Sequence, residues 1–131
     1  MPEARSLYRF PVHLGLGAQV EAQPEFSGMP WYADYAARHA ADGVEGRLVS
    51  LYDFAESWTS WEMHPAGAEL VVCLAGEIAL IQELDGAEAR TTLRAGEYAV
   101  NPAGVWHTAD VTAKATALFI TAGAGTEHRP R

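Results

Sequence analysis

The sequence predicts an all-β domain, an antiparallel sandwich or small barrel with one short helix before it. After residue 46, short stretches rich in β-branched and aromatic residues recur between turn signals. Asp85 and Gly86 form a hairpin signal, because glycine tolerates the positive φ that a type I′ turn requires. The 131 residues suffice for one core. Eight short strands in about 75 residues are typical of such an antiparallel architecture.

The part before residue 46 predicts loops and one helix. Proline and glycine punctuate residues 1–28, so we expect loops there, with one or two short strands. We expect a helix over residues 30–42, because Pro30 suits the first helical position and Gly43 suits the position just past the end. Two faces of this helix carry residues spaced four apart: Trp31, Tyr35 and His39 on one, Asp34, Arg38 and Asp42 on the other.

Eight strands are expected after the helix, each bounded by turn residues. They cover residues 47–54, 57–64, 69–75, 77–84, 87–93, 97–101, 105–111 and 115–121. The chain then ends in a glycine-rich and charged stretch, which predicts a loose tail. We therefore divide a single domain into an N-terminal arm (1–46), a barrel (47–122) and a C-terminal tail (123–131).

The charge balance argues against two classes of partner. The chain has 9 Lys and Arg against 17 Asp and Glu, a formal net charge of −8. Such a surface repels phosphate backbones and anionic membranes. The longest strongly apolar run, residues 70–75, falls far short of the roughly 20 residues that a bilayer span needs. We expect neither a nucleic-acid partner nor a membrane partner.

The sequence favours a cytoplasmic location. Residues 1–10 lack the apolar stretch of a secretory signal. Cys73 is the single cysteine, so no intramolecular disulfide can form, which suits a reducing compartment. Its place in an apolar strand is typical of a small core residue.

The residues that can carry chemistry lie in two segments. Glu62 and His64 share one face of their expected strand, because alternate side chains of a strand point the same way. Glu69 opens the following strand and would meet them if the two strands are neighbours. In the second segment His107 follows a turn, and a buried histidine needs a partner such as an acidic pair. Carboxylates and imidazoles are usable metal ligands.

These segments resemble the two motifs of the cupin superfamily. The first motif usually reads G-x5-H-x-H-x3,4-E-x6-G, and the second G-x5-P-x-G-x2-H-x3-N. The chain has Glu62-x-His64-x4-Glu69-x6-Gly76 and Gly96-x5-Pro102-x-Gly104-x2-His107. It departs from the pattern at three positions: Glu56 replaces the opening Gly, Glu62 the first His and Val111 the final Asn.

The resemblance implies a jelly-roll barrel of six to eight antiparallel strands that binds one divalent cation at its mouth. The ligands would be Glu62, His64, Glu69 and His107. Two carboxylates supply a charge of −2, and their hard oxygens favour Mn²⁺ or Fe²⁺ over Cu²⁺, with Zn²⁺ and Ni²⁺ also possible. Without Glu62 the other three form a facial triad that suits Fe²⁺. The alternative is a polar network without metal, in which Glu62 hydrogen-bonds His64 or His107.

Several other residues receive expectations. Candidate walls of a substrate pocket are Trp58, Tyr52, Val71 and Cys73. Histidines outside the motifs are expected not to bind metal: His13, His39 and His128. Leu70, Val72 and Leu74 face away from Glu69, and an exposed apolar row of this kind needs a cover, either a second sheet, the N-terminal arm or another subunit. The resemblance to small cupins predicts a homodimer.

The expected function is that of a metalloenzyme acting on a small oxygen-rich organic molecule. With Fe²⁺ this would be a dioxygenase, and with Mn²⁺ or Zn²⁺ an isomerase or lyase, the ion polarising two substrate oxygens. Glu62 would double as the catalytic base. The absence of a Lys or Arg cluster near the motifs weighs against a sugar phosphate as substrate. The alternative is a non-catalytic module that binds a sugar or small acid.

Overall fold

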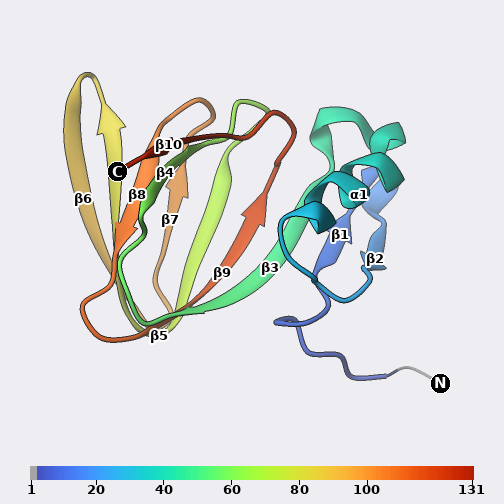
Figure 1. The fold of residues 1–131 in the computed structure, drawn as a ribbon, viewed down its shortest axis with the longest axis horizontal. Helices are drawn as coiled ribbons and strands as arrows, with labels where there is room; N and C mark the ends of the chain where they lie inside the picture. Colours follow the sequence, from blue (N-terminus) through green and yellow to red (C-terminus); the bar gives the residue numbers. More distant parts are fainter. Residues whose placement is uncertain (1–2) are drawn as a thin grey trace.

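A computed structural model describes residues 3–131, and within them it shows a mostly β architecture in which every strand pair is antiparallel (Figure 1). The strands are β1 (Val12–Leu14), β2 (Val20–Ala22), β3 (Arg47–Phe54), β4 (Ser60–Met63), β5 (Glu69–Leu84), β6 (Ala87–Arg94), β7 (Tyr98–Asn101), β8 (His107–Asp110), β9 (Ala115–Thr121) and β10 (Glu127–Pro130). The helices are α1 (Pro30–Arg38) and the 3-10 turns η1 (Leu16–Ala18) and η2 (Ala40–Glu45). The predicted fold class is confirmed.

The long strand β5 belongs to both faces of the barrel. Its first half pairs with β7 and β9 and its second half with β6 and β8, so the strand order is β10-β4-β8-β5-β9-β3-β1-β2. The register to β9 shifts between Cys73 and Ala75, and Gly76 follows at a φ of +71°. A Cβ at Gly76 would lie 2.1 Å from the carbonyl oxygen of Lys114, so only glycine fits. The strands predicted over residues 69–75 and 77–84 are thus one strand that bends at Gly76.

The hairpin signal is confirmed between β5 and β6. Asp85 and Gly86 both have positive φ, +52° and +78°, and the flanking Leu84 and Ala87 are paired. Beneath the strands, the inward side chains form one apolar core: Val71, Cys73, Ile78, Leu80, Leu93, Ala109, Val111, Ala115, Ala117 and Phe119. The described residues contain no helix that is long and apolar enough to cross a bilayer.

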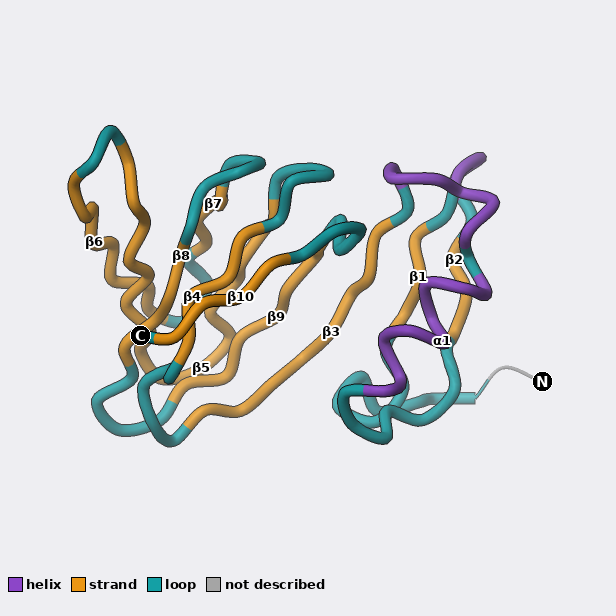
Figure 2. The backbone as a smooth tube through the Cα atoms, turned by 45° about the horizontal axis from the view of Figure 1, so that its top comes forward, coloured by secondary structure: helices purple, strands orange, loops and turns teal. Residues whose placement is uncertain are grey.

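The N-terminal arm extends the sheet beyond β3, with α1 lying against β1 and β2 (Figures 1 and 2). The one or two short strands expected there are present as β1 and β2. The helix, however, ends at Arg38 rather than at residue 42, and Gly43 lies inside η2 at a φ of +63°. The chain continues instead as the tighter turns of η2, in which Asp42 bonds to the buried His13 at 2.6 Å.

The C-terminal residues form a strand, so the prediction of a loose tail is wrong. β10 pairs with β4 along its whole length, and the two lie side by side in Figure 2. The Arg129 guanidinium lies over the rings of Trp61 and Trp106, at 5.1 and 4.6 Å, and pairs with Glu83. Charged residues that are typical of a solvated tail therefore have partners on the barrel.

Candidate metal centre

His64 and His107 each bond through Nδ1 to a neighbouring group and turn Nε2 toward the barrel interior. The Nδ1 of His107 donates to the Val105 carbonyl at 3.3 Å. The Nδ1 of His64 lies 2.8 Å from the Thr126 hydroxyl, which itself donates to the Gly123 carbonyl and therefore accepts from His64. A neutral imidazole has one proton, and these bonds place it on Nδ1. The Nε2 lone pairs of both rings are thus left facing the barrel interior.

Those two Nε2 atoms are buried and make no hydrogen bond of good geometry within the described structure. Buried polar atoms are nearly always paired, so two such atoms together indicate a missing partner. Both belong to imidazoles whose other nitrogen is anchored, the arrangement typical of histidines that bind a metal.

Glu69 lies directly opposite both Nε2 atoms. Its Oε2 is 3.2 Å from the Nε2 of His64, and its Oε1 is 3.3 Å from the Nε2 of His107. Asn101 donates to Oε1 at 3.0 Å and Thr121 donates to Oε2 at 2.6 Å, so the buried carboxylate is fixed in place. Burial opposes its ionisation, but the two imidazoles that face its oxygens outweigh burial and hold the pKa of Glu69 well below its usual range.

In the protein without an ion, the same contacts favour a proton on the imidazole. Burial lowers the pKa of His107, but the close approach of the Glu62 and Glu69 carboxylates prevails and raises it to about 9. A cation or a proton can satisfy this arrangement, and the two compete for the same nitrogen.

Glu62 approaches the same point from β4. Its Oε2 lies 3.7 Å from the Nε2 of His64 and 3.8 Å from that of His107, with which it is paired across β4 and β8. Its Oε1 lies 3.3 Å from the Nε2 of His128, its partner residue on β10. Glu62 is half-buried, whereas Glu69 is enclosed. The two carboxylates therefore differ in their access to solvent.

The geometry brings all four predicted ligands together. Glu62, His64 and His107 each offer an atom within 4.8 Å of the others, and Glu69 contacts both imidazoles. Two imidazole nitrogens with two carboxylates form a donor set that suits Fe²⁺, Mn²⁺ or Zn²⁺. The residues present fit one divalent ion.

Sequence analysis missed the residues that hold these four. Asn101 links Glu69 to Gln82, whose side-chain amide donates to Asn101 at 2.7 Å. An asparagine at the end of the expected strand 97–101, immediately before Pro102, is a signal that could have been noticed. Thr121 and Thr126 carry no such signal, because their role depends on where the chain returns after β9.

The predicted pocket residues lie in different places. The ring of Trp58 packs edge-on to that of His107 at 6.2 Å, and its Nε1 is buried without a partner in the described structure. Tyr52 packs on Phe119. Val71 and Cys73 are fully buried in the apolar core. Contact of any of these residues with a substrate stays a prediction.

One aromatic residue of the arm contacts a predicted pocket residue. The hydroxyl of Tyr32 on α1 lies 2.7 Å from that of Tyr52. Burial, the hydrogen bond with Tyr52 and the charge of Glu62 all raise the pKa of Tyr32. The arm therefore contributes a hydroxyl beside that of Tyr52, which the sequence pattern gave no reason to expect.

Two surface clefts lie away from the four ligands. One, of about 390 Å³, is lined by residues 53–59 and has Trp58 in its wall. The other, of about 560 Å³, is lined by residues 21–24 with Arg38 and His39.

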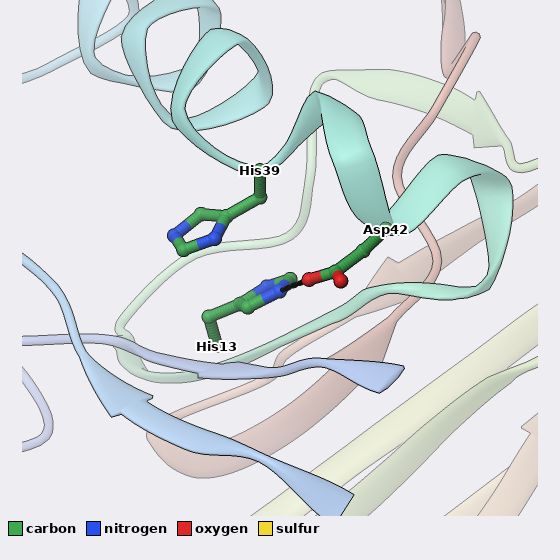
Figure 3. A group of neighbouring side chains, drawn as sticks. All are labelled: His13, His39 and Asp42. Carbon is green, nitrogen blue, oxygen red and sulfur yellow. Dashed lines mark hydrogen bonds and ion pairs between the residues drawn. The ribbon is translucent and has the colours of Figure 1, made fainter. Parts of the chain in front are cut away.

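A second cluster joins His13, His39 and Asp42 in the arm (Figure 3). His39, expected on the helix surface, stacks on the buried His13 with ring centroids 3.7 Å apart and planes 19° apart. Both nitrogens of His13 are already bonded, at 2.6 Å, to Asp42 and to the Tyr35 hydroxyl. A metal lies in the plane of each imidazole that binds it, and nearly parallel stacked rings do not point at one ion. The cluster is a hydrogen-bonded clamp between β1 and η2.

Comparison with known proteins adds the family. A family model for the cupin domain matches residues 51–123. Similar solved structures include a Neisseria meningitidis protein (TM-score 0.50, 23% identity, covering 57% of this chain and 72% of that one). Oxalate oxidase in complex with glycolate is another (TM-score 0.53, 20% identity, 62% and 45%). A third is hydroxypropylphosphonic acid epoxidase from S. wedmorenis with fosfomycin (TM-score 0.50, 17% identity, 57% and 43%).

This chain spans less than half the length of the oxidase and epoxidase chains. At these identities the likeness shows the fold alone. A search among curated proteins finds no match. The family model covers more than half of the chain, and its region contains Glu62, His64, Glu69 and His107. The chain therefore belongs to the cupin family.

Proposed function

We propose that this cupin is a divalent-metal enzyme that acts on a small oxygen-rich organic molecule, with Glu62, His64, Glu69 and His107 as the ligands. The observation that carries the proposal is the pair of buried, unbonded Nε2 atoms facing two carboxylates. In a polar network without metal, each Nε2 would instead carry a proton shared with a carboxylate, and a metal ion competes with that proton for the same nitrogen.

The charge of the site favours a particular substrate class. Two carboxylates offset a divalent ion, so a dianionic substrate gains no net attraction. The two arginines of the C-terminal segment, Arg129 and Arg131, are held by Glu83 and Asp110. A neutral or singly ionised molecule with two adjacent oxygens, such as a catechol, an enediol or a β-diketone, suits this centre better than a phosphate.

The chain's own residues divide the work. The bound ion would supply Lewis acidity to two substrate oxygens and, as Fe²⁺, access to dioxygen chemistry. Glu69 is enclosed and fixed by Asn101 and Thr121, so it serves as a static carboxylate. Glu62 is half-buried and has one oxygen turned toward His128, so it is placed to accept a proton from a substrate hydroxyl. Trp58 and Tyr52 supply apolar walls.

Dioxygen chemistry is the form of this proposal that we favour. Two of the similar structures are an oxidase and an epoxidase, which supports oxygen chemistry at the level of the fold. The donor set also suits Fe²⁺. An isomerase or lyase using Mn²⁺ or Zn²⁺ is the alternative within the same site.

Oxygen consumption tests this choice. The protein is loaded anaerobically with Fe²⁺ and offered catechols, β-diketones and keto acids in air-saturated buffer. We expect uptake with at least one class, lost in His107→Ala and retained in Glu127→Gln, an exposed residue of β10. Metal binding with no uptake on any class would contradict the dioxygenase and leave the isomerase or a non-catalytic binder.

We also propose that two copies associate through the outer face of β5 and β7. Leu70 pairs with Val100 and Val72 with Tyr98, and all four are apolar or aromatic. Tyr98 is 65% exposed and Val100 47%. Light scattering should give twice the 14.1 kDa of the chain, and a mass of 14.1 kDa at micromolar concentration would contradict the dimer. The predicted cytoplasmic location rests on the sequence alone.

A further inference from the structure

We propose that the C-terminal segment contributes two positioning residues to the metal centre, Thr126 for His64 and His128 for Glu62. This inference rests on the proposed function, because it concerns residues that hold the proposed ligands. From the sequence alone, the segment was expected to be a loose tail.

Thr126 fixes the orientation of His64. Its hydroxyl donates to the Gly123 carbonyl at 2.9 Å and accepts from the Nδ1 of His64 at 2.8 Å. This bond sets the tautomer and keeps the Nε2 lone pair toward Glu69 and Glu62. Without the hydroxyl, the imidazole of the buried His64 loses its anchor and can turn over.

His128 holds one oxygen of Glu62. The β4–β10 and β4–β8 pairings place His128, Glu62 and His107 in one row across three neighbouring strands. Because directly paired residues point to the same face of a sheet, all three lie on the face that carries the centre, with His128, which is 48% exposed, at its solvent edge. His128 engages Oε1 at 3.3 Å, and Oε2 is the atom that approaches His64 and His107. One oxygen of Glu62 is thus held by His128 on β10, and the other is left facing the two imidazoles.

The segment is built to stay in place. Arg129 lies over Trp61 and Trp106 on the opposite face of the strand from His128. Arg131 binds Asp110 at 2.5 Å and the carbonyls of Trp58 and Ala109 at 3.1 Å. These contacts fasten β10 to β4 and β8, the strands that carry Glu62 and His107. The last residues of the chain therefore complete the centre from outside the two motifs.

The functional consequence concerns the departure at Glu62. A glutamate there is more mobile than an imidazole ring, because it has more rotatable bonds. Because His128 on β10 fixes one oxygen of Glu62, the position of the other oxygen is better defined than in a free glutamate side chain. His128 and Glu62 are expected to act as a unit.

Cobalt titration of the chelator-treated full chain tests the inference, followed by the visible absorption of bound Co²⁺. The variants are Thr126→Val and His128→Ala, with Thr126→Ser and His128→Gln as conservative partners that keep a hydroxyl or an N–H donor. Glu127→Gln, on the other face of β10, is the control. Thermal melting of each metal-free variant separates loss of folding from loss of positioning.

We expect Thr126→Val and His128→Ala to bind Co²⁺ about 10- to 100-fold more weakly, with an altered spectrum. The conservative variants and Glu127→Gln should stay within about threefold of the unaltered protein. Binding by Thr126→Val and His128→Ala at unaltered affinity, with an unaltered spectrum, would overturn the inference and leave the proposed function standing. Failure of the unaltered protein to bind Co²⁺ would overturn both. If Thr126→Val does not fold, the two His128 variants decide.

Discussion

The Nε2 of His107 lies 3.3 Å from the Oε1 of Glu69, although the two residues come from opposite sheets of the barrel. Asn101 donates to the same Oε1 at 3.0 Å. The amide of Gln82 donates in turn to Asn101. A chain of polar contacts therefore links Gln82 in the second half of β5, Asn101 on β7, Glu69 at the start of β5 and His107 on β8. It ties the candidate ligands to the strand that joins the two sheets.

Replacing Asn101 by Ala should lower the free energy of unfolding by about 1–3 kcal/mol, because Glu69 and Gln82 each lose a buried partner. Chemical denaturation of the metal-free protein measures this. Thr91→Ala, exposed on β6, is the control and should change stability by less than about 0.5 kcal/mol. Equal stability of the two variants would show that these polar contacts of Asn101 do not stabilise the barrel.

The stability of the metal-free protein should fall as pH rises from about 6.5 to about 9. The pKa of His107 is raised from its ordinary 6.5 to about 9, so its contribution is full below 6.5 and is lost as pH passes through 9. The slope contributed by this one group is at most about 1.4 kcal/mol per pH unit. The pKa of Glu69 is lowered, so its contribution is present above 4.5 and is lost as pH falls below that value.

Unfolding curves at pH 5.5, 7 and 8.5 check this prediction. His107→Gln should remove most of the slope above pH 6.5. Saturating Mn²⁺ should also flatten it, since the ion replaces the proton and binds more tightly as pH rises. A metal-free protein that becomes more stable between pH 6.5 and 8.5 would contradict the protonation assigned to His107.

Gly76→Ala should destabilise the fold strongly. The new Cβ would meet the Lys114 carbonyl oxygen at 2.1 Å, and the residue would keep a φ of +71° that alanine disfavours. Backbone strain alone costs about 1–2 kcal/mol, and the contact adds to it. Gly86→Ala is the matched control, because Gly86 has a φ of +78° but a Cβ placed there would have nothing within 4 Å. Thermal melting should show the larger loss for Gly76→Ala, and equal losses would mean that the β5 bend tolerates a side chain.

Asp42→Asn should loosen the N-terminal arm. Asp42 bonds to the buried His13 at 2.6 Å, and the neutral amide is a weaker partner for that imidazole. We expect the melting temperature to fall by a few degrees and amide exchange in β1 and β2 to speed up. Asp34→Asn, on the exposed part of α1, should do neither. Unchanged exchange in Asp42→Asn would show that the clamp is not what holds the arm.

Much of the fold could be predicted because its signals are local. The Asp85–Gly86 turn depends on two adjacent residues, and the bounds of β3 and β9 follow from alternation within single strands. The four candidate ligands could be named because strand parity and motif spacing are also local. What could not be predicted depends on contacts between distant segments. In β10 and just after it, Arg129 and Arg131 bind partners on other strands, and beyond the end of α1 Asp42 bonds to His13; neither contact can be read from the local sequence.

The proposed function of this cupin depends on Glu62, His64, Glu69 and His107 holding one divalent ion. Metal analysis of protein purified without chelator, followed by Mn²⁺ titration of the chelator-treated protein, tests this binding without reference to any substrate. We expect about one equivalent of metal, lost in His107→Ala and kept in His39→Gln, whose parent histidine lies in the arm. Protein that binds no metal under either condition, or His107→Ala that binds as tightly as the unaltered chain, would show that these four residues are not a metal centre.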